Sequence, residues 1–421
     1  MRHGGKILIE CLQNLGARHA FGVPGESYLA ALDALHDTGG ALDFTLCRNE
    51  GGAAFMAAAY GKLTGTPGIC FVTRGPGATN ASIGVHTAMQ DSSPMILFVG
   101  QVGTDMMGRE AFQEIDYRAF YGTVAKGVTQ VDHIERLPEA ISRAWTTALS
   151  GRPGPVVVAL PEDMLSAQSD VPAITRPVHI ARPAPDTRAL AEAQQMIAAA
   201  ERPLIIMGGG SWTKDGSAAL QHFAEASDIP VLAGFRYMDL YDNFSPAYAG
   251  DAGVGMNPAT KELITSADLT VAIGIRFGEM VADGYTLMQV PEPAQHLIHV
   301  HSSDRELGKV YAPDIAIHAD PNAFAAALNP VSGAWSDWRA EARAGHEASL
   351  IAPPQPSAVD MGQVMTHLQS TLPDDTIITN GAGNFAIWPS RFFSYGPRNR
   401  LLAPQSGAMG YGLPAAIAAK V

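Results

Sequence analysis

Short β-branched runs alternate with alanine-rich stretches along most of this chain, and this alternation is the feature that most limits its possible folds. Examples of such runs are ICFVT (69–73), MILFV (95–99), PVVVAL (155–160) and PLIIM (203–207). Strands that alternate with helices form parallel sheets covered by helices on both faces. The sequence therefore predicts an α/β fold with doubly wound parallel sheets.

Two segments that lack this periodicity divide the chain. Residues 166–186 are proline-rich and predict a linker, and residues 328–358 form a second segment that we expect to lack regular structure. A length of 421 residues suggests about three domains, at roughly 150 residues each. We predict two doubly wound parallel-sheet domains plus the start of a third, incomplete α/β domain. The predicted boundaries are 1–165, 187–328 and 358–421.

The charge balance and the cysteine content limit the partners and the compartment. A net charge of −13 and a pI near 5.4 disfavour nucleic acid and anionic membranes as partners. The sequence shows no signal peptide and no apolar run that spans a bilayer. Three scattered cysteines without metal-ligand spacing fit a reduced compartment. We expect a cytoplasmic protein.

The stretch RNEGGAAFMAAAYGKLTG (48–65) places a carboxylate, Glu50, at the start of an apolar helix. One interpretation is a helix N-terminal acid, favoured by the helix dipole by about 0.3–1 kcal/mol. The other is functional, because Glu50 follows a strand that we expect to be parallel and central. Ligands of open α/β sheets bind at that carboxyl edge. There an acid flanked by glycine and alanine could exchange a proton with a heterocyclic nitrogen.

The next predicted strand ends in a second candidate motif, RGPGATN (74–80). Gly75 and Gly77 allow close approach of the backbone to a ligand, and Asn80 offers an amide in the first helical turn. An ordinary strand-to-helix turn explains this motif equally well when it is taken alone.

Several motifs in one order resemble the acetolactate synthase type of thiamine diphosphate enzymes. FGVPGE, RNEGGAAFMAAAYGKLTGTPG, TRGPGATN, PMILFVGQV with the three residues before it (91–102), AFQE and GRPGPVVVALPED resemble the pyrimidine-binding domain of that family. GAGNFAIW (381–388) and SGAMGYGLPAAIAA (406–419) resemble the start of its diphosphate-binding domain. The resemblance is dense in the first domain and loose in the second.

This resemblance implies a catalytic role for three residues. Glu50 would hydrogen-bond N1′ of the aminopyrimidine, so that the 4′-amino group becomes acidic enough to remove the C2 proton of the thiazolium and form a carbanion. Met409 would hold the cofactor bent, although Met also commonly fills gaps in a core. Gln113 would lie on the substrate side of the cofactor. Glu50 and Met409 would come from different chains, which implies a homodimer or homotetramer.

The remaining site residues are also carried over from the family motifs. Substrate contacts are implied for Phe112, Gln113 and Lys126. Cofactor contacts are implied for Gly25, Pro76, Asn80, Gly383, Asn384, Gly407, Met409, Arg152 and Arg276, the two arginines being those that match residues near the family's FAD.

The sequence departs from the family pattern in two respects. The family binds Mg²⁺ and the diphosphate through a later GDG…N motif, which this sequence lacks, so we predict no metal ligands in the chain. We therefore expect a fragment of a longer gene product or an inactive product. The acidic stretches that usually accompany FAD also differ, reading RFGEMVADGYT (276–286) and HVHSSDRELGK (299–309). FAD remains an open alternative.

The leading functional hypothesis is decarboxylation of a pyruvate-like 2-oxo acid, followed by carboligation to a second 2-oxo acid. One alternative is a thiamine diphosphate-dependent 2-oxo acid decarboxylase or aldehyde lyase. The other is an inactive fragment that lacks the magnesium–diphosphate site.

Overall fold

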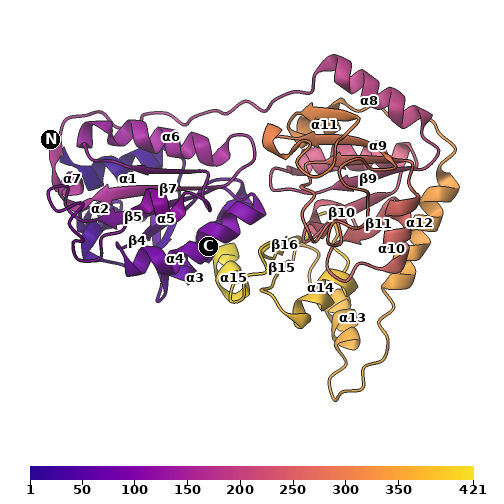
Figure 1. Ribbon diagram of the computed structural model, residues 1–421. Coiled ribbons are helices and arrows are strands. Elements are labelled where there is room, and N and C mark those ends of the chain that lie inside the picture. The colour runs from indigo at the N-terminus through magenta and orange to yellow at the C-terminus, as the bar shows by residue number, and fades with distance from the viewer. The chain divides into compact units, whose positions relative to one another are not determined.

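The computed structural model describes residues 1–421 and divides into two compact units (Figure 1). Met1–Ala181, Thr379–Gly381 and Pro404–Val421 make up the first unit. Arg182–Ile378 and Ala382–Ala403 make up the second unit. Each unit has its own six-stranded sheet and is described by itself.

The sheet of the first unit is parallel throughout and has the strand order β3-β2-β4-β5-β7-β6. Its strands are β2 (His19–Gly22), β3 (Asp43–Leu46), β4 (Gly68–Val72), β5 (Met95–Gln101), β6 (Gly127–Gln130) and β7 (Pro155–Pro161). The helices are α1 (Gly4–Leu15), α2 (Leu29–His36), α3 (Glu50–Thr64), α4 (Pro76–Asp91), α5 (Tyr117–Tyr121), α6 (Leu137–Leu149) and α7 (Glu162–Ser166). The chain order reverses between β2 and β4, so the switch point of the sheet lies there.

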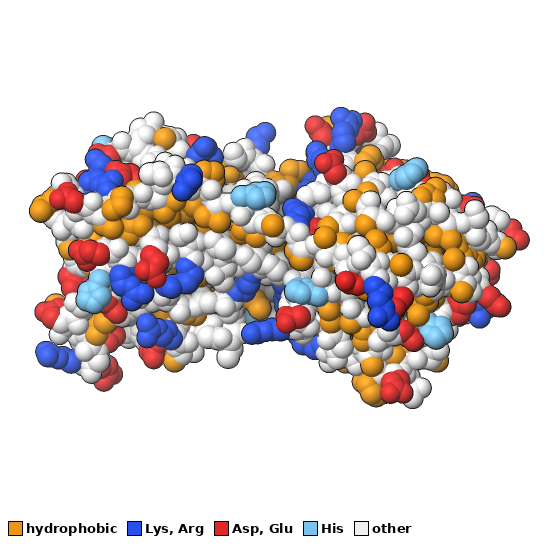
Figure 2. Space-filling view, turned by 90° about the horizontal axis from the view of Figure 1, so that it is seen from above, with side chains coloured by type: hydrophobic (Ala, Val, Ile, Leu, Met, Phe, Trp, Pro, Cys, Tyr) orange, Lys and Arg blue, Asp and Glu red, His pale blue; other side chains and the backbone are white.

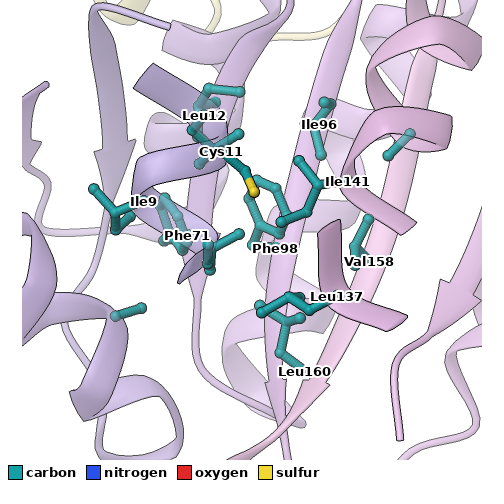
Figure 3. Packing of buried hydrophobic residues seen from close by; sticks show 14 of the residues in the cluster. Ile9, Cys11, Leu12, Phe71, Ile96, Phe98, Leu137, Ile141, Val158 and Leu160 are labelled. Carbon is teal, nitrogen blue, oxygen red and sulfur yellow. The ribbon is translucent and has the colours of Figure 1, made fainter. Parts of the chain in front are cut away.

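Alternate side chains of these strands point to opposite faces of the sheet and form two cores. Figure 3 shows one of them, in which Phe71, Ile96, Phe98 and Val158 of the strands pack against side chains of α1 and α6. Each such buried side chain contributes about 1.5–3 kcal/mol to folding. The neighbouring residues on the strands, such as Leu97, are also buried, on the face that α3 and α4 cover.

Helix α3 is apolar around almost its whole circumference because it is covered on every side. Its small residues allow close approach: a Cβ at Gly84 of α4 would collide with Ala54, and one at Gly68 would collide with the backbone of Ala57. Gly65, with φ of 70°, ends the helix. The glycine- and alanine-rich sequence is thus explained by close packing, which fixes the helix that begins with Glu50.

The second unit holds a parallel sheet with the strand order β11-β10-β9-β12-β13-β14. Its strands are β9 (Pro203–Met207), β10 (Val231–Gly234), β11 (Tyr248–Ala252), β12 (Leu269–Ile273), β13 (His296–His301) and β14 (Ile315–His318). Its helices are α8 (Thr187–Ala199), α9 (Lys214–Ala226), α10 (Pro258–Ser266), α11 (Pro321–Ala327), α12 (Ser336–Ser349), α13 (Met361–Thr371) and α14 (Ile387–Phe392). Ile205 and Val271 pack on one face of the sheet, and Ile206 and Ala272 pack on the other.

The C-terminal part of the chain adds a two-stranded sheet and one more helix. β15 (Ile377–Thr379) and β16 (Arg400–Leu402) form the small sheet, and α15 (Gly412–Lys420) belongs to the first unit. In Figure 1, α15 lies beside α3. The predicted α/β class with two doubly wound parallel sheets is confirmed.

Three local predictions differ from the structure. Residues 328–358 were expected to be irregular, but they contain α12. This helix is attached mainly by polar contacts, such as Trp338 Nε1 donating to the Pro203 carbonyl at 3.0 Å, so hydrophobic periodicity did not indicate it. The first helix was expected over 6–19 and ends at Leu15, because Gly16 takes φ of 105°. In the predicted linker, β8 (Gln168–Ser169) pairs antiparallel with β1 (Arg2–His3).

No helix of the structure combines the length and apolar character that a membrane span requires. On the face seen in Figure 2, acidic side chains stand among basic ones rather than in separate fields.

Candidate active site

Glu50 lies beside the switch point of the first sheet, at its carboxyl edge. It is the first residue of α3, which follows β3, and Asn49 caps this helix by accepting a 3.2 Å hydrogen bond from the Gly52 amide. The Glu50 side chain is half-buried. Glu50 is therefore both an acid at a helix N-terminus and a carboxylate at the carboxyl edge of the sheet, so its position fits both interpretations.

The two motifs found in the sequence meet at the Glu50 carboxylate. Asn80 of α4 donates from Nδ2 to Oε2 of Glu50 at 2.9 Å. The other oxygen, Oε1, has no hydrogen-bond partner, and a Cβ at Gly77 would lie 3.5 Å from it. The same Cβ would come within 2.9 Å of Thr73 Cγ2. Asn80 therefore orients the carboxylate, and Oε1 lies beside Gly77 without a hydrogen-bond partner.

The turn after β4 also holds the loop that carries Phe112 and Gln113. Gly75 has φ of 51°, and a Cβ there would lie 2.7 Å from the Gln113 carbonyl oxygen. The Gly75 amide donates to the hydroxyl of Tyr117 at 3.1 Å. Phe112 is 74% exposed, whereas Oε1 of Gln113 is buried without a hydrogen-bond partner. Both predicted substrate residues thus lie at the same sheet edge as Glu50.

Arg74 joins these loops, although the sequence analysis gave no role to this first residue of the RGPGATN motif. Its Nε donates to the Phe112 carbonyl at 3.2 Å, and its Nη1 pairs with Glu162, which follows β7, at 3.0 Å. A longer contact of 3.7 Å reaches Glu26. A charged residue directly before the glycine–proline turn was the available signal.

The remaining turn at this edge comes from the end of β2. A Cβ at Gly25 would lie 2.5 Å from Thr73 Cβ, so only glycine fits beside the turn after β4. The hydroxyls of Ser27 and Thr73 are 2.8 Å apart. Pro76 is the first residue of α4, where its fixed φ suits a helix start.

Met409 and Gly407 belong to the same unit as Glu50. Gly407 and Gly410 have φ of 64° and 83°, so they permit a tight turn around Met409, which is 78% exposed. The following helix α15 packs on α3, and the rings of Tyr411 and Phe55 meet edge to face at 5.5 Å. In this single chain the turn and Glu50 belong to the same unit, and the pairing of Glu50 with the Met409 turn of a second chain stays a prediction.

Lys126 and Arg152 lie at the opposite, amino edge of the sheet, so the structure does not bring Lys126 to the Glu50 edge of its own unit, and the substrate contact of Lys126 stays a prediction. Lys126 Nζ donates to the carbonyls of Thr147 and Ser150 at 2.5 and 2.6 Å, at the C-terminal end of α6. Burial, with a smaller effect of Arg152, lowers the pKa of Lys126 to about 8. Arg152 Nε donates to the Ser92 hydroxyl at 2.9 Å. Within this unit the Lys126 ammonium caps a helix instead of facing the Glu50 edge.

Gly383, Asn384 and Arg276 belong to the second unit. Gly383 has φ of 124° and, like Asn384, is exposed. Arg276 follows β12 at the carboxyl edge of the second sheet. No group of three or more His, Cys, Asp or Glu side chains is arranged to hold a metal ion.

At the switch point of the second sheet, between β9 and β12, glycines bring two backbone segments close together. Gly209 has φ of 93°, and a Cβ there would overlap the carbonyl oxygen of Gly274. A Cβ at Gly274 would lie 2.6 Å from the Gly208 carbonyl oxygen, which also accepts a 2.7 Å hydrogen bond from Trp212. Packing of backbone against backbone therefore explains Gly209 and Gly274, whereas a Cβ at Gly208 would meet the side chain of Ile275.

Two family models match this chain. One describes the N-terminal, cofactor-binding domain of thiamine pyrophosphate enzymes and covers residues 2–120, and the other describes their central domain and covers residues 190–328. The chain belongs to the thiamine pyrophosphate enzyme family. The resemblance to thiamine diphosphate enzymes of the acetolactate synthase type is confirmed. The predicted enzyme class, thiamine pyrophosphate-dependent and similar to acetolactate synthase, is confirmed as well.

Curated relatives of the thiamine pyrophosphate enzyme family resemble the whole chain. It is 30% identical to the large subunit of acetolactate synthase isozyme 2 of Escherichia coli, covering 100% of this chain and 76% of the relative. It is 32% identical to a probable acetolactate synthase large subunit of Methanocaldococcus jannaschii, covering 99% of this chain and 73% of the relative. Isozyme 1 of Escherichia coli is also 32% identical, over 99% of this chain and 74% of the relative.

Proposed function

We propose that this protein decarboxylates a pyruvate-like 2-oxo acid and joins the remaining fragment to a second 2-oxo acid. The observation that carries the proposal is the Glu50–Asn80 pair at the switch point of a thiamine pyrophosphate-binding domain, with one carboxylate oxygen that has no hydrogen-bond partner. The similarity to acetolactate synthase large subunits supports carboligation over simple decarboxylation.

The residues at this edge suit an aminopyrimidine. Glu50 Oε1 lies over Gly77 with no partner, so it can share a proton with a ring nitrogen. Asn80 holds the other oxygen and so fixes the direction of that proton. Bound thiamine diphosphate would supply the carbon nucleophile that attacks the 2-oxo group and the electron sink that allows CO₂ to leave.

The other residues of the edge would bind and orient the substrate. Gln113 has a buried side-chain oxygen without a partner, which can accept a hydrogen bond from a ligand. Phe112 offers an exposed apolar face beside it. Arg74, neutralised by Glu162, keeps the loop of Phe112 and Gln113 against the turn at Gly75.

We propose further that the protein acts as a homodimer or homotetramer. Leu413, Ile417 and Val421 are exposed at intervals of four residues along α15 and its end, which gives one apolar helix face. Exposed Met409 lies one further interval of four residues before this face. A second copy of the chain would cover these side chains, and sedimentation of the purified protein tests this assembly.

We also propose that magnesium and FAD are cofactors and that the protein is cytoplasmic. Magnesium would accompany the diphosphate, with no ligand assigned to this chain. FAD would lie near Arg276 in the second unit, and an absorbance scan of the purified protein for a flavin band tests it. A cytoplasmic location is supported by three free, buried cysteines, Cys11, Cys47 and Cys70.

The reaction is tested by incubating the purified protein with thiamine diphosphate, Mg²⁺ and pyruvate, and analysing the products. Acetolactate supports the proposal. Acetaldehyde as the only product would support the decarboxylase alternative instead. No binding of thiamine diphosphate in calorimetry with Mg²⁺ present would favour the inactive fragment.

A further inference from the structure

We propose that Asp91, paired with Lys62, is a positioning residue that, together with Thr87, fixes Gln405 and Ser406 and thereby sets the place of the Met409 turn. The role of that turn rests on the proposed function, but the anchoring itself does not. The proposal depends on three contacts between α3 or α4 and a segment more than 300 positions later in the sequence.

The first contact is made by a buried ion pair. Asp91, the last residue of α4, has a side chain 2% exposed, and Lys62 of α3 has one 7% exposed, with Nζ and Oδ2 3.3 Å apart. The other oxygen of Asp91, Oδ1, accepts a hydrogen bond from the backbone amide of Gln405 at 2.6 Å. A short hydrogen bond to a charged acceptor is stronger than one between neutral groups. One carboxylate thus joins α3, α4 and the C-terminal segment.

The second contact lies one helical turn before Asp91. Thr87 and Asp91 are four residues apart on α4 and therefore share a face. The hydroxyl of Thr87 lies 3.0 Å from that of Ser406. Consecutive residues of the segment, Gln405 and Ser406, are thus held by consecutive turns of one helix.

The third contact closes the turn from the other side. The ring of Tyr411 packs edge to face on Phe55 of α3, with centroids 5.5 Å apart. Residues 407–410 span the interval between Ser406 and Tyr411, and Met409 stands 78% exposed within it. A methionine that fills a core would be buried. The turn is therefore anchored at both ends so that its side chain projects from the unit.

A structural role in joining α3 to α4 does not account for this arrangement. Apolar residues can replace a buried ion pair without loss of stability, and α3 already packs closely on α4 through Gly84 and Ala54. The carboxylate has a use that an apolar pair would lack, because only an acceptor can bind the Gln405 amide. We therefore assign Asp91 to the placement of residues 404–410.

The experiment compares variants by hydrogen exchange in the cofactor-free protein and by the Kd for thiamine diphosphate with Mg²⁺. In Asp91→Ala, the amides of residues 405–410 are expected to exchange about tenfold faster, as for one lost hydrogen bond to a charged acceptor. The Kd is expected to rise by a similar factor. Thr87→Val leaves the ion pair intact, and we expect the same two changes at about two- to fivefold.

Two further variants separate anchoring from general stability. The double variant Asp91→Asn with Lys62→Met keeps an oxygen acceptor and removes both charges, and it should restore most of the exchange protection. Glu139→Gln, on an exposed ion pair of α6, should change nothing.

Unchanged exchange at 405–410 in both Asp91→Ala and Thr87→Val would overturn the proposal. Equal acceleration at 405–410 and in the strands β4 and β5 would also overturn it, because Asp91 would then only stabilise the unit. Faster exchange with an unchanged Kd would overturn the positioning role and would leave the proposed function to the Glu50 test.

Discussion

The carboxyl edges of the two sheets both carry glycine turns, but the glycines have different surroundings at the two edges. Both sheets have six parallel strands, and both carry glycine turns at their switch points. In the first unit, Gly77 lies beside an oxygen of Glu50 that has no hydrogen-bond partner. In the second unit, Gly209 and Gly274 bring two backbone segments into contact. Glycine at a switch point therefore indicates that two groups of the protein, or the protein and a ligand, approach closely. A charged side chain beside the glycine, such as Glu50, is what makes a catalytic role possible.

The largest expected effect concerns the charged residue at the first edge. Glu50→Gln keeps the size of the side chain and removes the exchangeable proton, so kcat should fall about 10²–10⁴-fold, the usual contribution of a positioned acid–base group. Steady-state turnover of pyruvate measures it, and circular dichroism verifies the fold. Wild-type turnover in this variant would contradict the catalytic role of Glu50, and the first edge would then no longer differ from the second in function.

The second expected effect concerns the glycines of the second edge. Gly209→Ala should lower the free energy of unfolding by about 2–4 kcal/mol, because the new Cβ overlaps the Gly274 carbonyl in a left-handed backbone. Denaturant unfolding measures this loss. Gly255→Ala is the matched control in the same unit, because φ is also positive there, at 69°, but no atom lies within 4 Å of the added Cβ. Equal losses in the two variants would contradict the packing explanation.

A smaller effect tests whether Asn80 orients the carboxylate. Asn80→Ala removes the 2.9 Å hydrogen bond to Glu50, and kcat should fall about tenfold, as expected for one hydrogen bond to a charged group. Ser82→Ala on the same helix is the control, since its hydroxyl bonds only the Thr79 carbonyl. An equal effect of both substitutions would show that helix stability, and not orientation, is measured.

The smallest effect is the pH dependence of the second unit. Burial lowers the pKa of His346 on α12 to about 4, below its unfolded value of about 6.5. The folded state then binds fewer protons than the unfolded state, so stability falls as the pH drops from about 6.5 to 4, by at most about 1.4 kcal/mol per pH unit. Denaturant unfolding of His346→Phe across this range should show a weaker decline.

Asp251 of β11 gives the opposite sign and serves as a control. Burial raises its pKa to about 6, although Arg391 opposes this shift, so its contribution to stability is present at low pH and is lost as the pH rises through 6. Asp251→Asn should therefore make the acid-induced loss of stability steeper. The same slope in both variants would contradict these assignments.

Most of the fold could be predicted from the sequence because its signals are local. The start and end of α3 at Glu50 and Thr64 were predicted correctly, since an N-terminal acid and a terminal glycine mark the helix. Helix α12 was not predicted, because Ala342 is its only buried residue and polar contacts hold it. Arg74 was not singled out either, because its partners, Glu162 and the Phe112 carbonyl, lie far away in the sequence.

The sequence by itself determined the family, the two parallel sheets and the place of Glu50 at the end of a strand. These follow from periodicity and from motifs that act within a few residues. Only the tertiary structure decided that Lys126 lies at the opposite edge from Glu50, and that Asp91 accepts a hydrogen bond from Gln405. Such contacts depend on which strand ends and loops the topology brings together. No local pattern along the chain shows which residues far apart in the sequence become neighbours.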